Sequence, residues 1–194
     1  AVRVYADAKR MLQRLIEGRW LTASGIVSFW PANTVNDDDI VLYTDESRTE
    51  VALTWYGMRQ QAEKQIIDGV MRPSRCLADF VAPKDSGIKD YVGVFAVTAG
   101  LGIEKKEKYF VDDLDDYSAI MLKALADRLA EAFAEAMHHR ARTDLWGYAT
   151  NEGLSNEDMI AEKYRGIRPA PGYPACPDHS VKGPMFDLLQ CADI

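Results

Sequence analysis

Asp37-Asp-Asp-Ile-Val-Leu-Tyr-Thr-Asp-Glu-Ser-Arg-Thr-Glu-Val-Ala-Leu-Thr-Trp55 contains two apolar runs separated by a polar segment, and it sets the architecture of this 194-residue chain. Three aspartates favour a turn, and the run from Ile40 to Tyr43 then predicts a strand. A polar loop, Asp45 to Arg48, leads to a returning strand over residues 51–55. The pattern predicts a β-hairpin, whose two strands are antiparallel.

Further elements are predicted on both sides of this hairpin. Before it, apolar residues recur at helical spacing from Val4 to Ile16, and Gly18 is expected to end that helix. A strand follows over residues 25–30 and is expected to close at Pro31. After the hairpin, the sequence predicts a helix over residues 59–67 and buried strands over residues 77–81 and 91–98.

The longest periodic segment spans residues 117–140, and its alanine-rich composition favours helix. One broad apolar face is formed by Ile120, Leu122, Leu125, Leu129, Phe133 and Met137. Ser155, followed three residues later by Asp158, predicts a capped helix that reaches about residue 164. A last helix is expected after Pro184.

Hairpin-linked strands followed by long helices indicate an α+β fold, with a twisted, largely antiparallel sheet flanked by helices. A Rossmann fold is not predicted, because no glycine-rich loop lies between a strand and a helix. The length and the absence of an internal linker predict one domain over residues 1–194. The chain begins without Met, so we expect that it belongs to a longer protein.

The bulk composition excludes several classes of partner. Asp and Glu number 30 against 23 Lys and Arg, a net charge of -7 that repels nucleic acid. No apolar run approaches the roughly 20 residues that cross a bilayer. Three cysteines without a CxxC pair are typical of reduced thiols, and we expect a cytoplasmic protein.

A proline-rich stretch, residues 167–177, offers the strongest candidate binding residues, and we call it the proline loop. Arg168 carries a planar fork of donors that suits a carboxylate or a phosphate. Two prolines stiffen the chain, Gly172 allows close approach to the backbone, and Tyr173 adds an aromatic face and a hydroxyl. The alternative from composition alone is a stiff crossover, with Arg168 capping a helix and Tyr173 packed in the core.

Arg168-Pro-Ala-Pro-Gly-Tyr-Pro-Ala-Cys-Pro-Asp-His179 closely resembles the signature of the activation domain of cobalamin-dependent methionine synthase, whose RxxxGY core lines the S-adenosylmethionine site. Further resembling blocks follow in the family's order. They are Phe29-Trp-Pro-Ala-Asn33, Tyr43-Thr-Asp-Glu-Ser-Arg48, Arg59-Gln-Gln61, Cys76-Leu-Ala-Asp-Phe-Val-Ala-Pro83, Lys123-Ala-Leu-Ala-Asp-Arg-Leu-Ala-Glu-Ala-Phe-Ala-Glu135 and Trp146-Gly-Tyr148.

The resemblance implies a role for each matching residue. Arg168 is expected to hold the methionyl carboxylate of the ligand, with backbone groups near Ala170 and Gly172 around the rest. Tyr173 is expected near the sulfonium and the transferable methyl group, as the candidate catalytic residue. Three acidic candidates remain: Glu131 and Glu162 near the ligand, with a solvated helix face as the alternative, and Asp127 as a contact to the cobalamin module.

No metal site is predicted in this chain. His138 and His139 lie near the end of the long helix, where a cation suits the helix dipole. Cys176 and His179 form one pair of possible ligands, and no second pair completes a zinc site. Trp146 and Tyr148 are expected to be core or interface aromatics.

The resemblance implies reactivation of methionine synthase, which transfers a methyl group from methyltetrahydrofolate to homocysteine. One electron, from flavodoxin or an equivalent reductase, and one methyl group from S-adenosylmethionine convert cob(II)alamin to methylcobalamin. The cobalamin-binding module is the expected partner, and cobalamin and zinc are expected on other modules. The family also carries flanking segments that residues 1–194 lack, so we expect a domain trimmed at both ends with weakened binding. The alternative function is a corrinoid-protein docking module that has lost S-adenosylmethionine binding.

Overall fold

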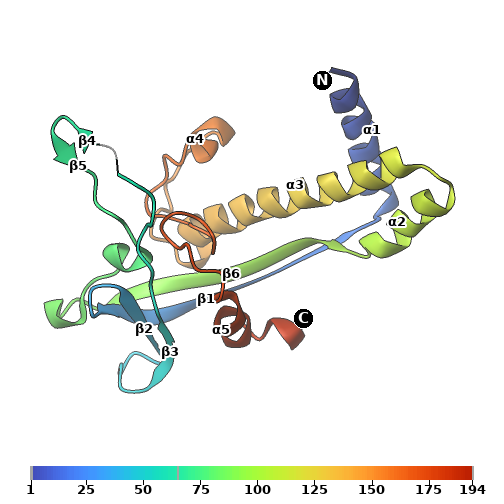
Figure 1. Ribbon diagram of the computed structural model, residues 1–194. Coiled ribbons are helices and arrows are strands. Elements are labelled where there is room, and N and C mark those ends of the chain that lie inside the picture. The colour runs from blue at the N-terminus through green and yellow to red at the C-terminus, as the bar shows by residue number, and fades with distance from the viewer. Residues whose placement is uncertain (1, 65, 194) are drawn as a thin grey trace. The chain divides into compact units, whose positions relative to one another are not determined.

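The computed structural model describes residues 2–64 and 66–193 (Figure 1). Ala1, Gln65 and Ile194 lie outside the described residues, although the predicted domain includes all three and the predicted helix over residues 59–67 includes Gln65. The chain divides into two compact units, and we describe each by itself. Unit 1 is Ala1–Ile26 with Ala96–Thr150, and unit 2 is Val27–Phe95 with Asn151–Ile194.

The described residues form helices, strands and short helical turns. The α-helices are α1 (Val2–Gly18), α2 (Ile103–Asp112), α3 (Asp116–Arg140), α4 (Asn156–Ile160) and α5 (Lys182–Leu188). The strands are β1 (Thr22–Val35), β2 (Asp39–Tyr43), β3 (Val51–Trp55), β4 (Ile66–Ile67), β5 (Val70–Met71) and β6 (Asp90–Leu101). The short turns are η1 (Leu77–Phe80), η2 (Lys84–Ser86), η3 (Ala141–Leu145), which is a π-helix, and η4 (Cys191–Asp193).

Four strands form the main sheet in the order β3-β2-β1-β6, and β1 and β6 are its long members (Figure 1). The pairs β1/β2 and β2/β3 are antiparallel, with Thr34 opposite Ile40 and Leu42 opposite Leu53. The predicted hairpin and the predicted α+β fold with an antiparallel sheet are therefore confirmed. The prediction that Pro31 closes the first strand is wrong, since β1 continues to Val35. Its paired residues with β2 begin at Ala32, so Pro31 needs no hydrogen-bond partner there.

The core of unit 1 lies among α1, α2 and α3. Its buried residues are Met11, Leu15, Phe110, Ala119, Met121 and Leu122. Leu125 and Leu129 pack against this cluster, as the predicted face of α3 requires. The apolar face of α3 is narrower than predicted, because Ile120 is 65% exposed. In α1, Val4 and Ile16 of the predicted apolar pattern are exposed as well.

α3 ends at Arg140, and the π-helix η3 follows it directly, so that the chain stays helical to Leu145. The N–H of Trp146 donates to the carbonyl of Ala141, five residues back, at 2.9 Å. Within this extended helix Arg142 is fully buried, and its Nη1 lies 2.7 Å from Nδ1 of the buried His138. Arginine has donors only, so Nδ1 of His138 must accept this hydrogen bond. His138 is therefore an interior acceptor.

Arg142→Met is expected to lower the free energy of unfolding by about 1–3 kcal/mol, because it leaves the acceptor of His138 without this donor inside the protein. Arg140→Met is the matched control, since the Arg140–Asp144 ion pair is 65% and 66% exposed. An exposed pair of this kind contributes at most about 0.5 kcal/mol. Urea unfolding of both variants measures the difference, and equal losses would contradict the interior role of Arg142.

In unit 2, hydrogen bonds from Arg48 hold the loop of the predicted hairpin against β1 and β6. Its guanidinium donates to the carbonyl of Ala32 at 3.1 Å, to Oδ1 of Asn33 at 2.7 Å and to the carbonyl of Asp90 at 2.8 Å. The same group lies over the ring of Tyr43 at 5.8 Å. Arg48 thus links the hairpin loop to β1 and to the start of β6.

The predicted helix over residues 59–67 is wrong. The N–H of Gln60 donates to the carbonyl of Arg75 at 2.9 Å, so this backbone bonds across the loop and not along a helix. Ile67 pairs with Val70 across a two-residue turn. Asp68 and Gly69 of that turn have φ angles of 53° and 76°, as an Asp-Gly hairpin turn requires.

The predicted strand over residues 77–81 is also wrong, because η1 replaces it. The Sγ of Cys76 accepts from the N–H of Ala78 at 3.2 Å, and Asp79 accepts from the N–H of Cys76 at 3.0 Å. These reciprocal bonds form a capping box, which favours a helical turn over an extended strand.

The last two predicted helices exist with different bounds. Ser155 and Asp158 form the predicted capping box, but α4 ends at Ile160 because Glu162 adopts a left-handed φ of 55°. α5 begins at Lys182, before Pro184. Proline is tolerated there, since the first turn of a helix has no internal partner for its N–H groups.

Candidate functional site

The proline loop contains a tight turn at its centre. The N–H of Tyr173 donates to the carbonyl of Ala170 at 3.0 Å, with Pro171 and Gly172 between them. Gly172 has a φ of 102°, which completes a type II turn and favours glycine. The turn fixes the direction of the Ala170 carbonyl and leaves its second lone pair for another donor.

A second turn locks the first in place. The N–H of Gly172 donates to the carbonyl of Cys176 at 2.8 Å, and the N–H of Cys176 donates to the carbonyl of Tyr173 at 2.9 Å. Cys176 is 4% exposed, and its burial raises the pKa of the thiol. Tyr173, by contrast, is 62% exposed. The loop therefore holds the backbone of Tyr173 rigidly while its phenol faces outward.

The other predicted residues of unit 2 flank this double turn. Arg168 is half-buried at the start of the loop, so it is not packed entirely inside the core. Glu162 is exposed just after α4, with the left-handed backbone described above. Unit 2 thus brings Arg168, Ala170, Gly172 and Tyr173 into one short segment, with Glu162 six residues before it.

Asp127 and Glu131 lie in unit 1, one turn apart on α3. Both are exposed, and Glu131 forms an ion pair with Arg128 at 2.6 Å. Their predicted roles stay predictions.

Across residues 2–64 and 66–193, no group of three or more His, Cys, Asp or Glu side chains is arranged to hold a metal ion. Within the same ranges no helix is long and apolar enough to span a membrane. All three cysteines are free. Trp146 is 38% exposed and meets Tyr148 edge-on, with ring centroids 5.3 Å apart.

Sequence reasoning considered His179 only as a metal ligand, and the structure places it against the central turn. A Cβ added at Gly172 would lie 2.4 Å from Cε1 and 2.6 Å from Nε2 of His179. The imidazole ring therefore rests on the Cα of Gly172. The motif contains both residues, but nothing in its spacing indicates this contact.

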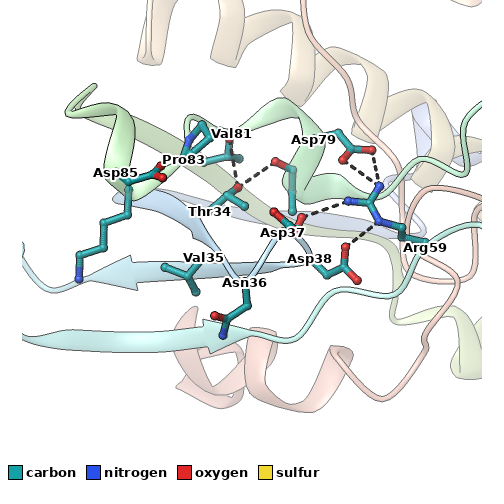
Figure 2. Close-up of a pocket in the computed structure, with 12 residues that line it drawn as sticks. Thr34, Val35, Asn36, Asp37, Asp38, Arg59, Asp79, Val81, Pro83 and Asp85 are labelled. Atoms are coloured by element: carbon teal, nitrogen blue, oxygen red, sulfur yellow. Dashed lines mark hydrogen bonds and ion pairs between the residues drawn. The ribbon is translucent and has the colours of Figure 1, made fainter.

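A cavity of about 740 Å³ lies elsewhere in unit 2 and is shown in Figure 2. Its wall includes Thr34, whose single hydroxyl proton is shared between the carbonyls of Ala78 at 2.8 Å and Val81 at 3.1 Å. The other lining residues are Val35, Asn36, Asp37, Asp38, Arg59, Ala78, Asp79, Val81, Pro83, Lys84 and Asp85. None of the predicted ligand residues lines this cavity.

Arg59 in this cavity is engaged by the protein itself. Nε pairs with Asp38 at 2.6 Å, Nη1 with Asp79 at 2.9 Å, and Nη2 donates to the carbonyl of Asp37 at 3.1 Å (Figure 2). The hydrogen bond to Asp79 raises the pKa of Arg59. The guanidinium of Arg59 is thus directed at partners within the protein. We assign it a structural role, in which it holds the segment that was predicted to be a helix over residues 59–67.

The family model described as "Vitamin B12 dependent methionine synthase, activation domain" matches residues 1–194. The chain belongs to this family. A solved structure described as "Crystal Structure of the MetH Reactivation Domain bound to AdoHcy" is 52% identical to this activation domain and superimposes with a TM-score of 0.88. The match covers 98% of this chain and 57% of that chain. The activation domain described here therefore spans less than two thirds of the length of that solved chain.

Proposed function

We propose that this activation domain binds S-adenosylmethionine at the proline loop and supports the reductive methylation of cob(II)alamin. The observation that carries the proposal is the double turn, which holds Ala170, Gly172 and Tyr173 in one rigid segment two residues after Arg168. A rigid segment pays little ordering entropy when a ligand binds. The solved relative, described as bound to AdoHcy, supports a ligand of this class.

Each residue of the loop suits one part of that ligand. The fork of Arg168 matches the methionyl carboxylate, and the free lone pair of the Ala170 carbonyl suits a donor such as the ligand's ammonium. The exposed phenol of Tyr173 is proposed to lie near the methyl group that is transferred. The carboxylate of Glu162 adds attraction for a ligand that carries an ammonium and a sulfonium.

This domain is proposed to belong to a cytoplasmic methionine synthase, in which another module carries cobalamin. One electron, from flavodoxin or an equivalent reductase, and the methyl group of S-adenosylmethionine give methylcobalamin and S-adenosylhomocysteine. The proposed reaction needs no general base from this chain, because cobalamin would supply the nucleophile. The protein's contribution is position and electrostatics.

Two measurements on the full-length protein that carries this domain test the proposal. Calorimetric titration with S-adenosylmethionine is expected to show one site. S-adenosylmethionine with a labelled methyl group, added with a chemical reductant to the cob(II)alamin form, is expected to deliver the label to cobalamin. Absence of both binding and transfer would overturn the proposal and favour a docking module that does not bind S-adenosylmethionine.

Tyr173→Phe is expected to slow methyl transfer by roughly 3- to 10-fold, the loss of one hydrogen bond, while the Kd for S-adenosylmethionine changes less than about twofold. A contact made mainly in the transition state has this effect. Tyr109→Phe is the control, because Tyr109 of α2 is 60% exposed, close to the exposure of Tyr173. Equal losses in affinity and rate would make Tyr173 an ordinary contact of the bound ligand.

A further inference from the structure

The central turn of the proline loop is held from two sides. On one side, the N–H of Gly172 donates to the carbonyl of Cys176 at 2.8 Å. On the other, the ring of His179 contacts the Cα of Gly172 so closely that an added Cβ would lie 2.4 Å from Cε1. Real Cβ atoms do not approach so near, so this contact is open to glycine alone. The turn is therefore held by a hydrogen bond to the Cys176 carbonyl and by contact with the His179 ring.

The backbone that carries His179 is itself anchored. Asp178 accepts two hydrogen bonds from Ser180, one from Oγ at 2.6 Å and one from the N–H at 2.8 Å. These bonds lower the pKa of Asp178, and the side-chain bond has the larger effect. The carbonyl of His179 accepts from the N–H of Lys182 at 3.2 Å, at the start of α5. His179 thus projects from a fixed position.

We propose that His179 is a positioning residue for S-adenosylmethionine, acting through Gly172 and not by touching the reacting atoms. Its ring packs against the Pro171-Gly172 turn and keeps that turn in its observed conformation. The turn then orients the Ala170 carbonyl and the phenol of Tyr173. The inference rests on the proposed function of the loop. Beyond that function, the flat ring of His179, seven residues after Gly172, is inferred to determine how fully the turn is formed before the ligand binds.

The first test uses no ligand. Amide hydrogen exchange in the full-length protein follows the Tyr173 N–H, which donates to Ala170, and the Gly172 N–H, which donates to Cys176. In His179→Ala both amides are expected to exchange roughly 10-fold faster, while amides of α3 keep their rates. Unchanged exchange at Gly172 and Tyr173 would overturn the inference.

The second test measures the Kd for S-adenosylmethionine by calorimetry. His179→Ala is expected to raise it roughly 3- to 10-fold, the effect of ordering one or two additional groups on binding. His179→Phe, which restores a flat ring without nitrogen atoms, is expected to bind within about threefold of the wild type. Lys182→Ala is the matched control, because its side chain is exposed and its backbone N–H is retained.

The outcomes separate the inference from the proposed function. If the wild type binds and His179→Ala binds equally well, the positioning role is wrong and the proposed function stands. If His179→Ala and His179→Phe lose the same affinity, the ring is not the platform, and the inference is again overturned. If the wild type does not bind, the proposed function fails, and the exchange experiment alone then judges the contact between His179 and the turn.

Discussion

Arg168→Ala is expected to weaken S-adenosylmethionine binding by roughly 10- to 150-fold, the loss of about 1.5–3 kcal/mol for charge-assisted hydrogen bonds to a carboxylate. Arg168→Lys keeps the positive charge but loses the planar fork, so its affinity should fall between those of the wild type and the alanine variant. Calorimetry on the full-length protein measures all three.

Arg165→Ala supplies the control for this series, because Arg165 is exposed and lies three residues before Arg168. Its Kd is expected to stay within about twofold of the wild type. An Arg168→Ala variant that binds as tightly as the control would remove Arg168 from the site. The alternative of a stiff crossover, with Arg168 capping a helix, would then be preferred for the proline loop.

Gly172→Ala is expected to have an effect of comparable size, roughly 30-fold or more on the Kd. A non-glycine residue at a φ of 102° is strained by about 1–3 kcal/mol, and the new methyl group must also displace the ring of His179. The turn is therefore expected to open, which moves the Ala170 carbonyl and Tyr173 together. Calorimetry measures the change in the Kd, and a thermal melt measures the loss of stability that the backbone strain causes.

Gly183→Ala is the control for the glycine series, since an added Cβ there meets nothing within 4 Å and the residue lies in α5. Alanine in a helix is expected to leave the melting temperature unchanged or to raise it slightly. Combining Gly172→Ala with His179→Ala removes the collision but keeps the backbone strain. The combined loss should be smaller than the sum of the single losses, and strict additivity would contradict a direct contact.

The hairpin and the long helix were predictable from the sequence because their patterns are local. Two apolar runs around a polar loop indicate a pair of antiparallel strands wherever the rest of the chain lies. The segment that begins at Arg59 was not predictable in this way. Its helical composition is overridden by bonds from Arg59 to Asp38 and Asp79, which lie 21 residues before it and 20 residues after it.

Of the two capping boxes described above, the sequence predicted one and missed the other. Ser155 and Asp158 were correctly predicted as a capping box, but the box does not fix the length of the helix that it starts. Cys76 and Asp79 form the same arrangement, and it was missed because cysteine is not an expected cap. The apolar residues that follow were therefore misinterpreted as a strand.

The candidate site also contains residues that the sequence reveals and a contact that it does not. Arg168, Gly172 and Tyr173 could be selected from the sequence because their motif is contiguous and each residue has a distinct chemistry. The contact between Gly172 and His179 depends on a left-handed glycine and on the path of the chain through two turns. Neither can be deduced from residue spacing, so a structure was needed to find it.

The π-helical turn at Ala141–Leu145 has a consequence for how this family can vary in length. A π turn holds one residue more than a regular α turn, so losing a single residue there would let the helix continue as an ordinary α-helix. The backbone would gain regular hydrogen bonds, yet every later residue would rotate by about 100° around the axis. Trp146 and Tyr148 would then leave their present orientations. Single-residue deletions between 143 and 145 are therefore expected to misdirect Trp146 and Tyr148, even though the helix backbone would keep its hydrogen bonds.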